Sequence, residues 1–365
     1  MKVLYDYQKF SVQRAGGITR YFAELFDHFS SEVEPLVSLK FNRNIYISGR
    51  DDIFLRKVRN YDFRFRGSRV LTAAVDRINQ FYSLYDLENC RYDIFHPTYY
   101  NCYFFDAGVD KPIVVTVHDM IQEIFPEEFS EEIILQKKRH ILESDHIVAV
   151  SKNTKDDILK FYPQISPDKI SVIYHGASFG MLVPEEFQVP EKYLLFVGRR
   201  DGYKNFLNFL SAIIPLLSSD PGLSIVCAGE DLKPYEKAFI AEHGISDRIF
   251  CSRVSDSRLL YLYMKAEAFV FPSLYEGFGL PVLEAFRAGC PICLSDASCF
   301  PEIAGDAAFY FDPSSSESIL ETVSRCLKDG YARKKAIERG YLRLRDFSWE
   351  KSASSLEKVY AGLLG

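Results

Sequence analysis

The stretch EGFGLPVLE, residues Glu276–Glu284, carries two carboxylates with seven residues between them and a glycine-containing turn that leads into a predicted helix. Pro281 suits the first helical position, where a missing N–H costs nothing, and Gly289 suits the C-terminal stop. We therefore expect Glu276 in a loop and Glu284 in the first turn of a helix that ends before Gly289.

The start of this helix predicts a site for an anion. The N–H groups of Gly279, Leu280 and their neighbours point out of the helix, where donors and the helix dipole together stabilise a phosphate. Nearby carboxylates can hold sugar hydroxyls through charge-assisted hydrogen bonds. A simpler explanation of the two glutamates is structural, because an acidic side chain near a helix N-terminus stabilises the helix by about 0.3–1 kcal/mol. The stretch indicates a nucleotide-sugar site only in combination with other residues.

Length and composition narrow the class of protein. The chain has 365 residues, which suits two hydrophobic cores, and its net charge of −6 argues against a general nucleic-acid binder. No signal peptide or membrane-spanning apolar run is visible, and the eight cysteines show no disulfide rhythm. We interpret Cys290 and Cys293 as buried thiols in a strand, and we expect a reduced, cytoplasmic chain.

The first half alternates strand and helix patterns, which is typical of a parallel, doubly wound sheet. Strand-like segments are Lys2–Tyr5, Tyr92–Phe95, Ile113–Val117, Ile147–Val150 and Ile170–Tyr174. Helices are expected over Ile18–Phe29, Glu131–Glu143 and Thr154–Phe161.

A linker, His175–Val189, is rich in glycine, proline and acidic residues, and the alternating pattern restarts after it. The later strand candidates are Tyr193–Val197, Leu223–Cys227, Arg248–Cys251, Ala268–Phe271, Pro291–Leu294 and Ala308–Phe311. A last helix follows Ser348 as N-cap. We predict two Rossmann-like α/β domains, residues 1–182 and 183–347, facing each other across a ligand-binding cleft, and a C-terminal crossover helix, residues 348–365, that packs back on the N-terminal domain.

Two cations follow the strand that ends at Val197. Arg199 and Lys204 lie in one strand-to-helix turn at the carboxyl end of the second sheet. A guanidinium fork and a mobile ammonium suit a diphosphate, and both favour its departure as a leaving group. Two solvated surface cations are an equally good explanation on position alone.

The N-terminal half offers further candidates. Gly16 and Gly17 precede a helix near the end of the first strand, where they allow a phosphate or sugar to approach the backbone, or merely form a turn that needs positive φ. There is no complete Gly-x-Gly-x-x-Gly, which disfavours hydride transfer. His118 directly follows a buried strand, where it could bond a sugar hydroxyl or be structural.

Taken together, these residues resemble family 4 of the retaining glycosyltransferases, which have the GT-B fold. The resemblance is strongest over Phe196–Pro301, which contains Gly198-Arg199, Lys204-Asn205, the stretch PSLYEGFGLPVLEA and the run AGCP. Leu4–Asp6, Gly16–Tyr21 and Thr116–Met120 are similar to bacterial mannosyltransferases of O-antigen and capsule assembly.

The resemblance implies a role for each candidate residue. Arg199 and Lys204 hold the leaving diphosphate, and the backbone around Phe278, Gly279 and Leu280 cradles the distal phosphate. Glu276 bonds the donor sugar, and Glu284 bonds the ribose diol. Further roles fall to His118 near the reaction centre, Gly16 and Gly17 near phosphate and acceptor, and the turn Cys251–Val254 beside the base. Whether Arg199 acts without its neighbour Arg200 stays open.

The same resemblance implies a reaction that keeps the anomeric configuration through a short-lived oxocarbenium ion pair. The leaving phosphate helps to take the acceptor's proton, and no cofactor or metal is expected. The chain contains no Asp-x-Asp, which agrees with that expectation.

The expected function is transfer of a hexose, mannose from GDP-mannose, to a saccharide or lipid-linked acceptor of surface polysaccharide. The alternatives are a UDP-sugar-dependent transferase, a nucleotide-sugar epimerase or oxidoreductase, and a glycan- or nucleotide-binding protein without catalytic activity. The basic, aromatic segment Phe54–Val70 suggests weak peripheral contact with a membrane. The alternative, which the pattern slightly favours, is a charged edge of the domain that faces solvent.

Overall fold

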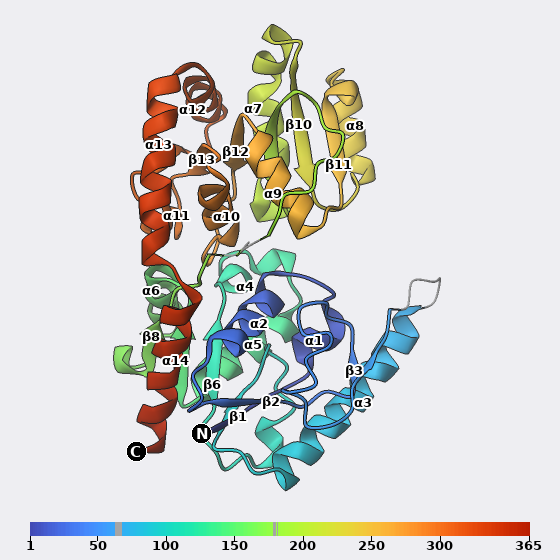
Figure 1. Cartoon of the computed structure of the whole chain (residues 1–365), viewed down its shortest axis with the longest axis vertical. Coiled ribbons are helices and arrows are strands. Elements are labelled where there is room, and N and C mark those ends of the chain that lie inside the picture. Colours follow the sequence, from blue (N-terminus) through green and yellow to red (C-terminus); the bar gives the residue numbers. More distant parts are fainter. Residues whose placement is uncertain (63–67, 178–179, 181) are drawn as a thin grey trace. The chain divides into compact units, whose positions relative to one another are not determined.

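The computed structural model describes the chain except residues 63–67, 178–179 and 181 (Figure 1). It divides into two compact units. Unit 1 combines Met1–His175 with Trp349–Gly365, and unit 2 is Gly176–Ser348. The first boundary therefore lies at the start of the expected linker. Among the described residues, no helix has the length and apolar character needed to cross a bilayer.

Unit 1 is built on parallel strands. Their order is β2-β1-β5 followed by β6-β7-β8, and a parallel bridge between Phe95 and Ile113 joins the two sets. The strands are β1 (Lys2–Tyr5), β2 (Glu34–Val37), β5 (Ile94–His96), β6 (Val114–Val117), β7 (His146–Ala149) and β8 (Ile170–Val172). The predicted parallel sheet is confirmed. The edge strand β2 was not predicted, because Pro35 interrupts its pattern, and an edge is where a sheet tolerates proline.

Helices and short elements complete unit 1. The helices are α1 (Gln8–Val12), α2 (Gly17–His28), α3 (Ser68–Asn89), α4 (Ile121–Ile124), α5 (Glu131–Glu143), α6 (Lys152–Phe161) and α14 (Trp349–Leu364). A small parallel pair joins β3 (Phe41–Asn42) to β4 (Arg59–Asn60).

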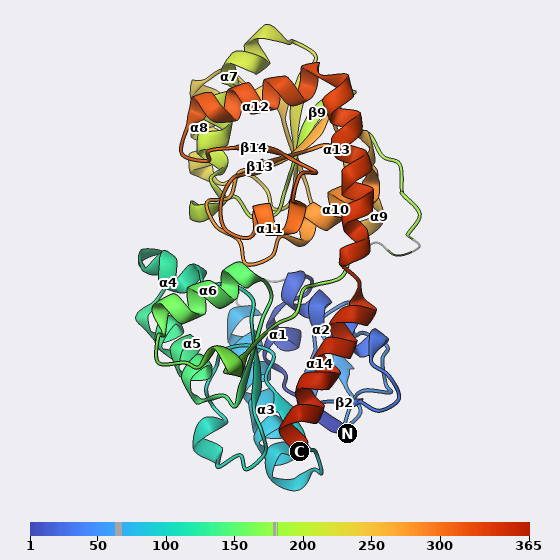
Figure 2. The same cartoon turned by 90° about the vertical axis from the view of Figure 1, so that its left-hand side faces the viewer.

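The C-terminal helix α14 packs on unit 1, as the fold prediction required, and Figure 2 shows it beside α2. Tyr360 of α14 is fully buried, and its hydroxyl lies 2.8 Å from the Tyr5 hydroxyl of β1 and 2.6 Å from His96 Nδ1 of β5. The helix therefore completes the core over the centre of the sheet, although more than 250 residues separate it in sequence from these partners.

Unit 2 has one six-stranded parallel sheet of order β11-β10-β9-β12-β13-β14. Its strands are β9 (Lys192–Val197), β10 (Leu223–Ala228), β11 (Ile249–Ser252), β12 (Ala268–Phe271), β13 (Ile292–Ser295) and β14 (Phe309–Phe311). Its helices are α7 (Phe206–Ser219), α8 (Pro234–Glu242), α9 (Asp256–Lys265), α10 (Leu280–Ala288), α11 (Phe300–Ala304), α12 (Ser316–Lys328) and α13 (Gly330–Arg343).

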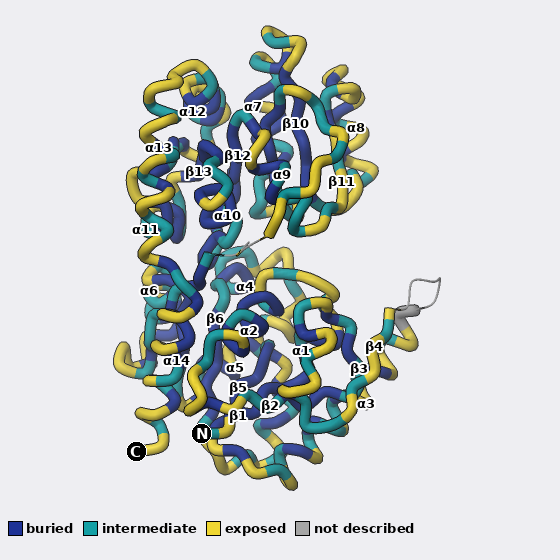
Figure 3. Tube along the Cα trace, in the orientation of Figure 1, coloured by how far each residue is buried: buried dark blue, intermediate teal, exposed yellow. Residues whose placement is uncertain are grey.

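The strands of unit 2 form the buried layer of its core, drawn dark blue in Figure 3. Cys290 and Cys293 are buried thiols beside and within β13, and burial raises the pKa of Cys290, as expected of core residues. Because strand order runs outward in opposite directions from β9 and β12, the topology reverses between these neighbours. Ligands of open α/β sheets bind at such a switch point, outside the carboxyl ends of the strands.

Candidate functional site

The loop after β9 is fixed by a close backbone approach. Gly198 has a left-handed φ of 110°, and Gly229 follows β10 next to it. A Cβ on Gly229 would lie 2.5 Å from the Gly198 carbonyl oxygen, a distance that no side chain tolerates. The two loops can therefore approach only through glycine, and this contact sets the position of the turn that carries Arg199 and Lys204.

Lys204 and Glu276 meet at the switch point. The Lys204 Nζ lies 2.5 Å from Glu276 Oε1, and the two side chains are only 15% and 12% exposed. The Ser273 hydroxyl also donates to Glu276 Oε1, at 2.7 Å, and Glu276 N–H donates to Ser298 Oγ at 3.1 Å. Among the described residues, Glu276 Oε2 has no hydrogen bond, so this oxygen is open to a hydroxyl donor. The structure thus brings together two residues that lie 72 positions apart in sequence.

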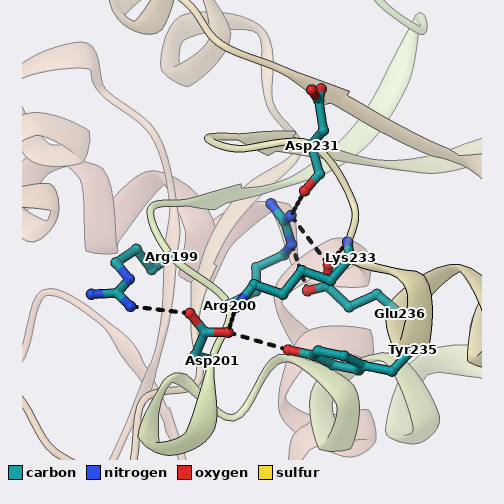
Figure 4. Close-up of polar contacts among 7 residues, drawn as sticks. All are labelled: Arg199, Arg200, Asp201, Asp231, Lys233, Tyr235 and Glu236. Carbon is teal, nitrogen blue, oxygen red and sulfur yellow. Dashed lines mark hydrogen bonds and ion pairs between the residues drawn. The ribbon is translucent and has the colours of Figure 1, made fainter. Parts of the chain in front are cut away.

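The two neighbouring arginines have different environments (Figure 4). Arg200 is buried, and its guanidinium donates to Glu236 Oε1 at 2.8 Å and to the Asp231 carbonyl at 2.9 Å. Arg199 points away, is 75% exposed, and bonds Asp201 Oδ2 at 3.3 Å. Arg200 therefore anchors the turn to α8, and Arg199 is the arginine that an anion from solution can reach.

Asp201 organises the outer part of this turn. Its Oδ1 accepts a hydrogen bond from the Tyr235 hydroxyl at 3.2 Å and forms an ion pair with Lys233 (Figure 4). Asp201 therefore stands between two cations, Arg199 and Lys233. This network was not predicted, because nothing in the spacing of Lys233 and Tyr235 relates them to Asp201.

The helix start that carries the EGFGLPVLE stretch is largely as predicted. Gly279 is the N-cap with a left-handed φ of 87°, and Gly289 ends the helix with φ 66°. The helix begins at Leu280, one residue earlier than expected, because the left-handed glycine turns the chain into the helix directly. Pro281 is therefore the second helical residue. The expectation that Glu284 lies in the first turn is wrong: it is the fifth residue and lies in the second turn.

Residues around α10 are packed rather than exposed. Glu284 is 5% exposed, and its Oε2 accepts a hydrogen bond from the buried Tyr263 of α9 at 3.2 Å. Phe278 is also buried, with its ring 5.9 Å from that of Phe347. This packing holds the backbone that precedes α10 in one position.

The turn predicted to meet the base lies at the carboxyl end of the edge strand β11. Cys251 and Val254 are half-buried there. A hydrogen bond with Cys227 lowers the pKa of Cys251, and the same bond helps to raise the pKa of Cys227. The two residues lie opposite each other in the register of β10 and β11.

In unit 1, His118 follows β6 directly. Its ring lies edge-on to Tyr21 at 5.2 Å and stacks on His175 at 6.2 Å. Burial lowers its pKa, which keeps the imidazole neutral. Its Nε2 is buried and has no hydrogen-bond partner among the described residues. A neutral imidazole with an unused nitrogen is suited to a hydroxyl group.

The loop after His118 is held by an unpredicted buried cation. Lys137 of α5 is fully buried, and its Nζ lies 2.7 Å from the Asp119 carbonyl, from Gln122 Oε1 and from Glu123 Oε2. Ile134 and Ile141, three residues before and four residues after Lys137, could have indicated that Lys137 lies on the inward face of the helix. Three acceptors satisfy its three donors, so Lys137 fixes the backbone beside His118.

Gly16 and Gly17 lie at the start of α2, with Gly16 as its N-cap. The backbone of Gly16 is extended, at φ 166°, and neither Gly16 nor Gly17 adopts the left-handed conformation. The alternative of a turn that needs positive φ is therefore wrong. A Cβ on Gly16 would lie 2.1 Å from the Gln13 amide nitrogen, so this glycine leaves room for a side chain that folds over the helix start.

The basic segment Phe54–Val70 is only partly described, since residues 63–67, with Arg64 and Arg66, lie outside the described residues. Lys57 and Arg59 are exposed. Arg56 forms an ion pair with the fully buried Asp86 and lies over the Tyr82 ring at 4.6 Å. Arg56 therefore serves the packing of α3, and the membrane hypothesis stays a prediction for the other residues.

Two family models match the chain. Residues 15–178 match glycosyltransferase family 4, and residues 183–343 match the glycosyl transferases group 1. The chain belongs to the family 4 glycosyltransferases. Both halves of this family 4 protein, which carry the candidate residues of unit 1 and unit 2, lie within the matched ranges.

Curated relatives of this family 4 chain include O-antigen mannosyltransferases. The O-antigen chain mannosyltransferase RfbU of Salmonella typhimurium is 31% identical over 207 residues, which cover 56% of this chain and 58% of that protein. The O-antigen chain mannosyltransferase B of Escherichia coli is 28% identical over 265 residues, which cover 68% and 69% respectively.

Solved structures agree on the fold. Sucrose-phosphate synthase from Thermosynechococcus elongatus superposes with a TM-score of 0.76 at 17% identity, covering 99% of this chain and 98% of that one. Anabaena HepE, solved in complex with UDP and glucose, gives a TM-score of 0.74 at 14% identity and covers 99% of each chain. The family 4 chain therefore has the GT-B fold, as predicted.

Proposed function

We propose that this family 4 protein is a retaining, metal-independent hexosyltransferase that uses a nucleotide-sugar donor. The observation that carries the proposal is the shielded Lys204–Glu276 pair, 2.5 Å apart at the switch point of unit 2 and followed in the chain by the start of α10. The pair supports the proposal because a cation can bind a diphosphate and a neighbouring carboxylate can accept hydrogen bonds from sugar hydroxyls. A site that binds only a nucleotide has no need of that carboxylate.

In the proposed donor complex, Arg199 and Lys204 bind the diphosphate and stabilise the charge that develops as it leaves. The backbone around Phe278–Leu280 would receive the distal phosphate, because the start of α10 lies there and a helix N-terminus favours an anion. A hydrogen bond to a charged group contributes about 1.5–3 kcal/mol. Such contacts promote the reaction to the extent that they strengthen as the glycosidic bond breaks.

Glu276 would accept hydrogen bonds from the donor sugar through its open Oε2. Glu284, held by Tyr263, would receive the ribose diol, and the base would lie against Cys251–Val254. His118, kept neutral by burial, would bond a sugar hydroxyl through Nε2. In the proposed retaining reaction the leaving phosphate takes the acceptor's proton, so no side chain is assigned as general base.

The proposed donor is GDP-mannose, and the proposed acceptor is a saccharide, lipid-linked, in surface polysaccharide assembly at the cytoplasmic face of the membrane. The support for mannose is that two relatives are O-antigen chain mannosyltransferases. A UDP-sugar is the alternative donor, since the proposed base site consists of a strand end and its turn rather than of a base-specific side chain.

The first experiment is thermal stabilisation of the purified chain by GDP, UDP, ADP, GDP-mannose, UDP-sugars and NAD, in EDTA. A ligand that binds only the native state stabilises it by about 2.7 kcal/mol at one hundred times its Kd. Stabilisation by one nucleoside diphosphate and its sugar supports the proposal and identifies the base. A response to NAD alone, or to no nucleotide, would overturn it.

Turnover is then followed by NMR of the released or transferred sugar. Retention requires that the first-formed product has the donor's anomeric configuration, and inversion would contradict the mechanism. The matched control is Lys192→Met, which removes an ion pair with Asp220 at the opposite end of β9 and should leave turnover unchanged.

A further inference from the structure

Unit 1 contains a pocket of about 490 Å³ that is lined mainly by polar and charged residues and has no role in the proposed donor complex. It lies between the loop after α1, the β3–β4 pair and the segment that follows β3, and its size is in the range of small-ligand sites. Its principal lining residues are Arg14, Asn42, Arg43, Asn44, Asn60 and Tyr61.

The asparagines form a rigid wall. The Asn42 amide donates to the Asn44 carbonyl and to Asn60 Oδ1, both at 2.9 Å. The Asn44 amide donates to the carbonyls of Gln13 and Arg14, at 2.9 and 3.2 Å. Asn42 and Asn44 are each 1% exposed. The side chains of this wall are therefore already ordered and hydrogen-bonded without a ligand, which lowers the entropic cost of binding.

The cations of the pocket are not satisfied in the same way. The half-buried Arg43 has no ion pair and no side-chain hydrogen bond among the described residues, and its Nε is buried without a partner. Arg14 faces Asp62 at a long 3.8 Å, with its side chain 55% exposed. Among the described lining residues, two guanidinium groups thus face one carboxylate. Buried polar atoms without partners are rare in proteins, so Arg43 marks a place for an acceptor group.

We propose that this pocket binds an anionic group carried by a saccharide, either the carboxylate of an acidic sugar or a phosphate. A guanidinium presents a planar fork of donors that matches both groups, and Arg43 and Arg14 would share the charge. Arg14 lies two residues before Gly16, so a bound saccharide would lie near the start of α2. Identifying that saccharide as the acceptor rests on the proposed function, whereas anion binding by the pocket does not.

The test measures binding of small probes by ligand-observed NMR at low ionic strength, where surface charges are least screened. The probes are glucuronic acid for the carboxylate, mannose 6-phosphate for the phosphate, and methyl α-mannoside as the neutral control. We expect at least one anionic probe to bind more tightly than the neutral one. The tighter of the two shows whether the pocket prefers a carboxylate or a phosphate. Arg43→Gln should weaken that binding about tenfold, and Asp62→Asn should strengthen it.

Two controls separate the possible failures. Arg139→Gln removes an arginine of unit 1 that already pairs with Asp106 and Glu143, so it should leave probe binding unchanged. Nucleotide stabilisation should be the same in Arg43→Gln and wild type, which also reports on folding. Equal binding of neutral and anionic probes, or unchanged affinity in Arg43→Gln, would overturn the inference. Loss of nucleotide stabilisation in the wild type would instead contradict the proposed function.

Discussion

Replacing Arg200 and Arg199 in turn by methionine should give opposite results, although the two are adjacent in sequence. The Arg200 and Glu236 side chains are 3% and 0% exposed. In Arg200→Met the Glu236 carboxylate stays buried and, among the residues that the structure describes, keeps one hydrogen bond, from Lys233 N–H at 2.6 Å. Removing one partner of a buried ion pair destabilises a protein by about 3–5 kcal/mol. That is a large part of a typical total of about 5–15 kcal/mol.

Arg199→Met should change stability by about 0.5 kcal/mol or less, because exposed ion pairs contribute little. It should instead weaken nucleotide binding about tenfold, which corresponds to the loss of one charge-assisted hydrogen bond.

The assay is urea denaturation with two probes. Far-UV circular dichroism reports both units, whereas fluorescence of Trp349, the single tryptophan of the chain, reports unit 1. In Arg200→Met we expect part of the dichroism transition to move to lower urea while the fluorescence transition stays in place. Similar stability losses in both variants, or a stable Arg200→Met, would refute the assignment of Arg200 to structure and Arg199 to ligand.

Three further results are expected. Glu276→Gln and Lys204→Met should each abolish most transfer while leaving the chain folded, with a lowered melting temperature because each variant breaks a shielded ion pair. Near-normal turnover in either would mean that the site is misassigned. Tyr360→Phe should destabilise unit 1 by about 1–3 kcal/mol, measured through Trp349 fluorescence, because the hydroxyls and ring nitrogen it joins are buried; an unchanged midpoint would show that these bonds contribute nothing. Acid should unfold unit 1 before unit 2. Burial lowers the pKa of His96 and His175 to about 3 and of His140 to about 4, so their stabilising contribution is complete above the unfolded value near 6.5 and is lost as pH falls below it. Unit 2 has one histidine, the exposed His243, and simultaneous loss of both units between pH 6.5 and 4 would contradict the expectation.

The regular elements were predictable where the pattern was strong. Ala268–Phe271 and Glu131–Glu143 have the predicted bounds, because a short apolar run and an amphipathic period are local signals. The edge strand β2 and the two-residue strands β3 and β4 were missed, since such pieces exist only through their partners. The start of α10 was displaced by one residue because the conformation of Gly279 overrides the preference of Pro281.

The candidate site shows the same division between local and distant information. The sequence indicated Lys204 and Glu276 as candidates, but only the sheet order shows that β9 and β12 are neighbours and that the two side chains touch. It could not separate Arg199 from Arg200, because their difference is created by Glu236 on another helix. The roles of Ser273 and Ser298 beside Glu276 likewise depend on loops that meet only in the folded chain.

The position of Tyr360 has a consequence for synthesis of the protein. During translation, β1 and β5 emerge early, but the hydroxyl that joins Tyr5 to His96 belongs to a helix made more than 250 residues later. Unit 2 is continuous from Gly176 to Ser348, so all of its strands and helices are made before α14. Unit 1 must wait with an open apolar face until the last helix arrives. Unit 1, whose first strands are made earliest, is therefore the unit whose core is completed later.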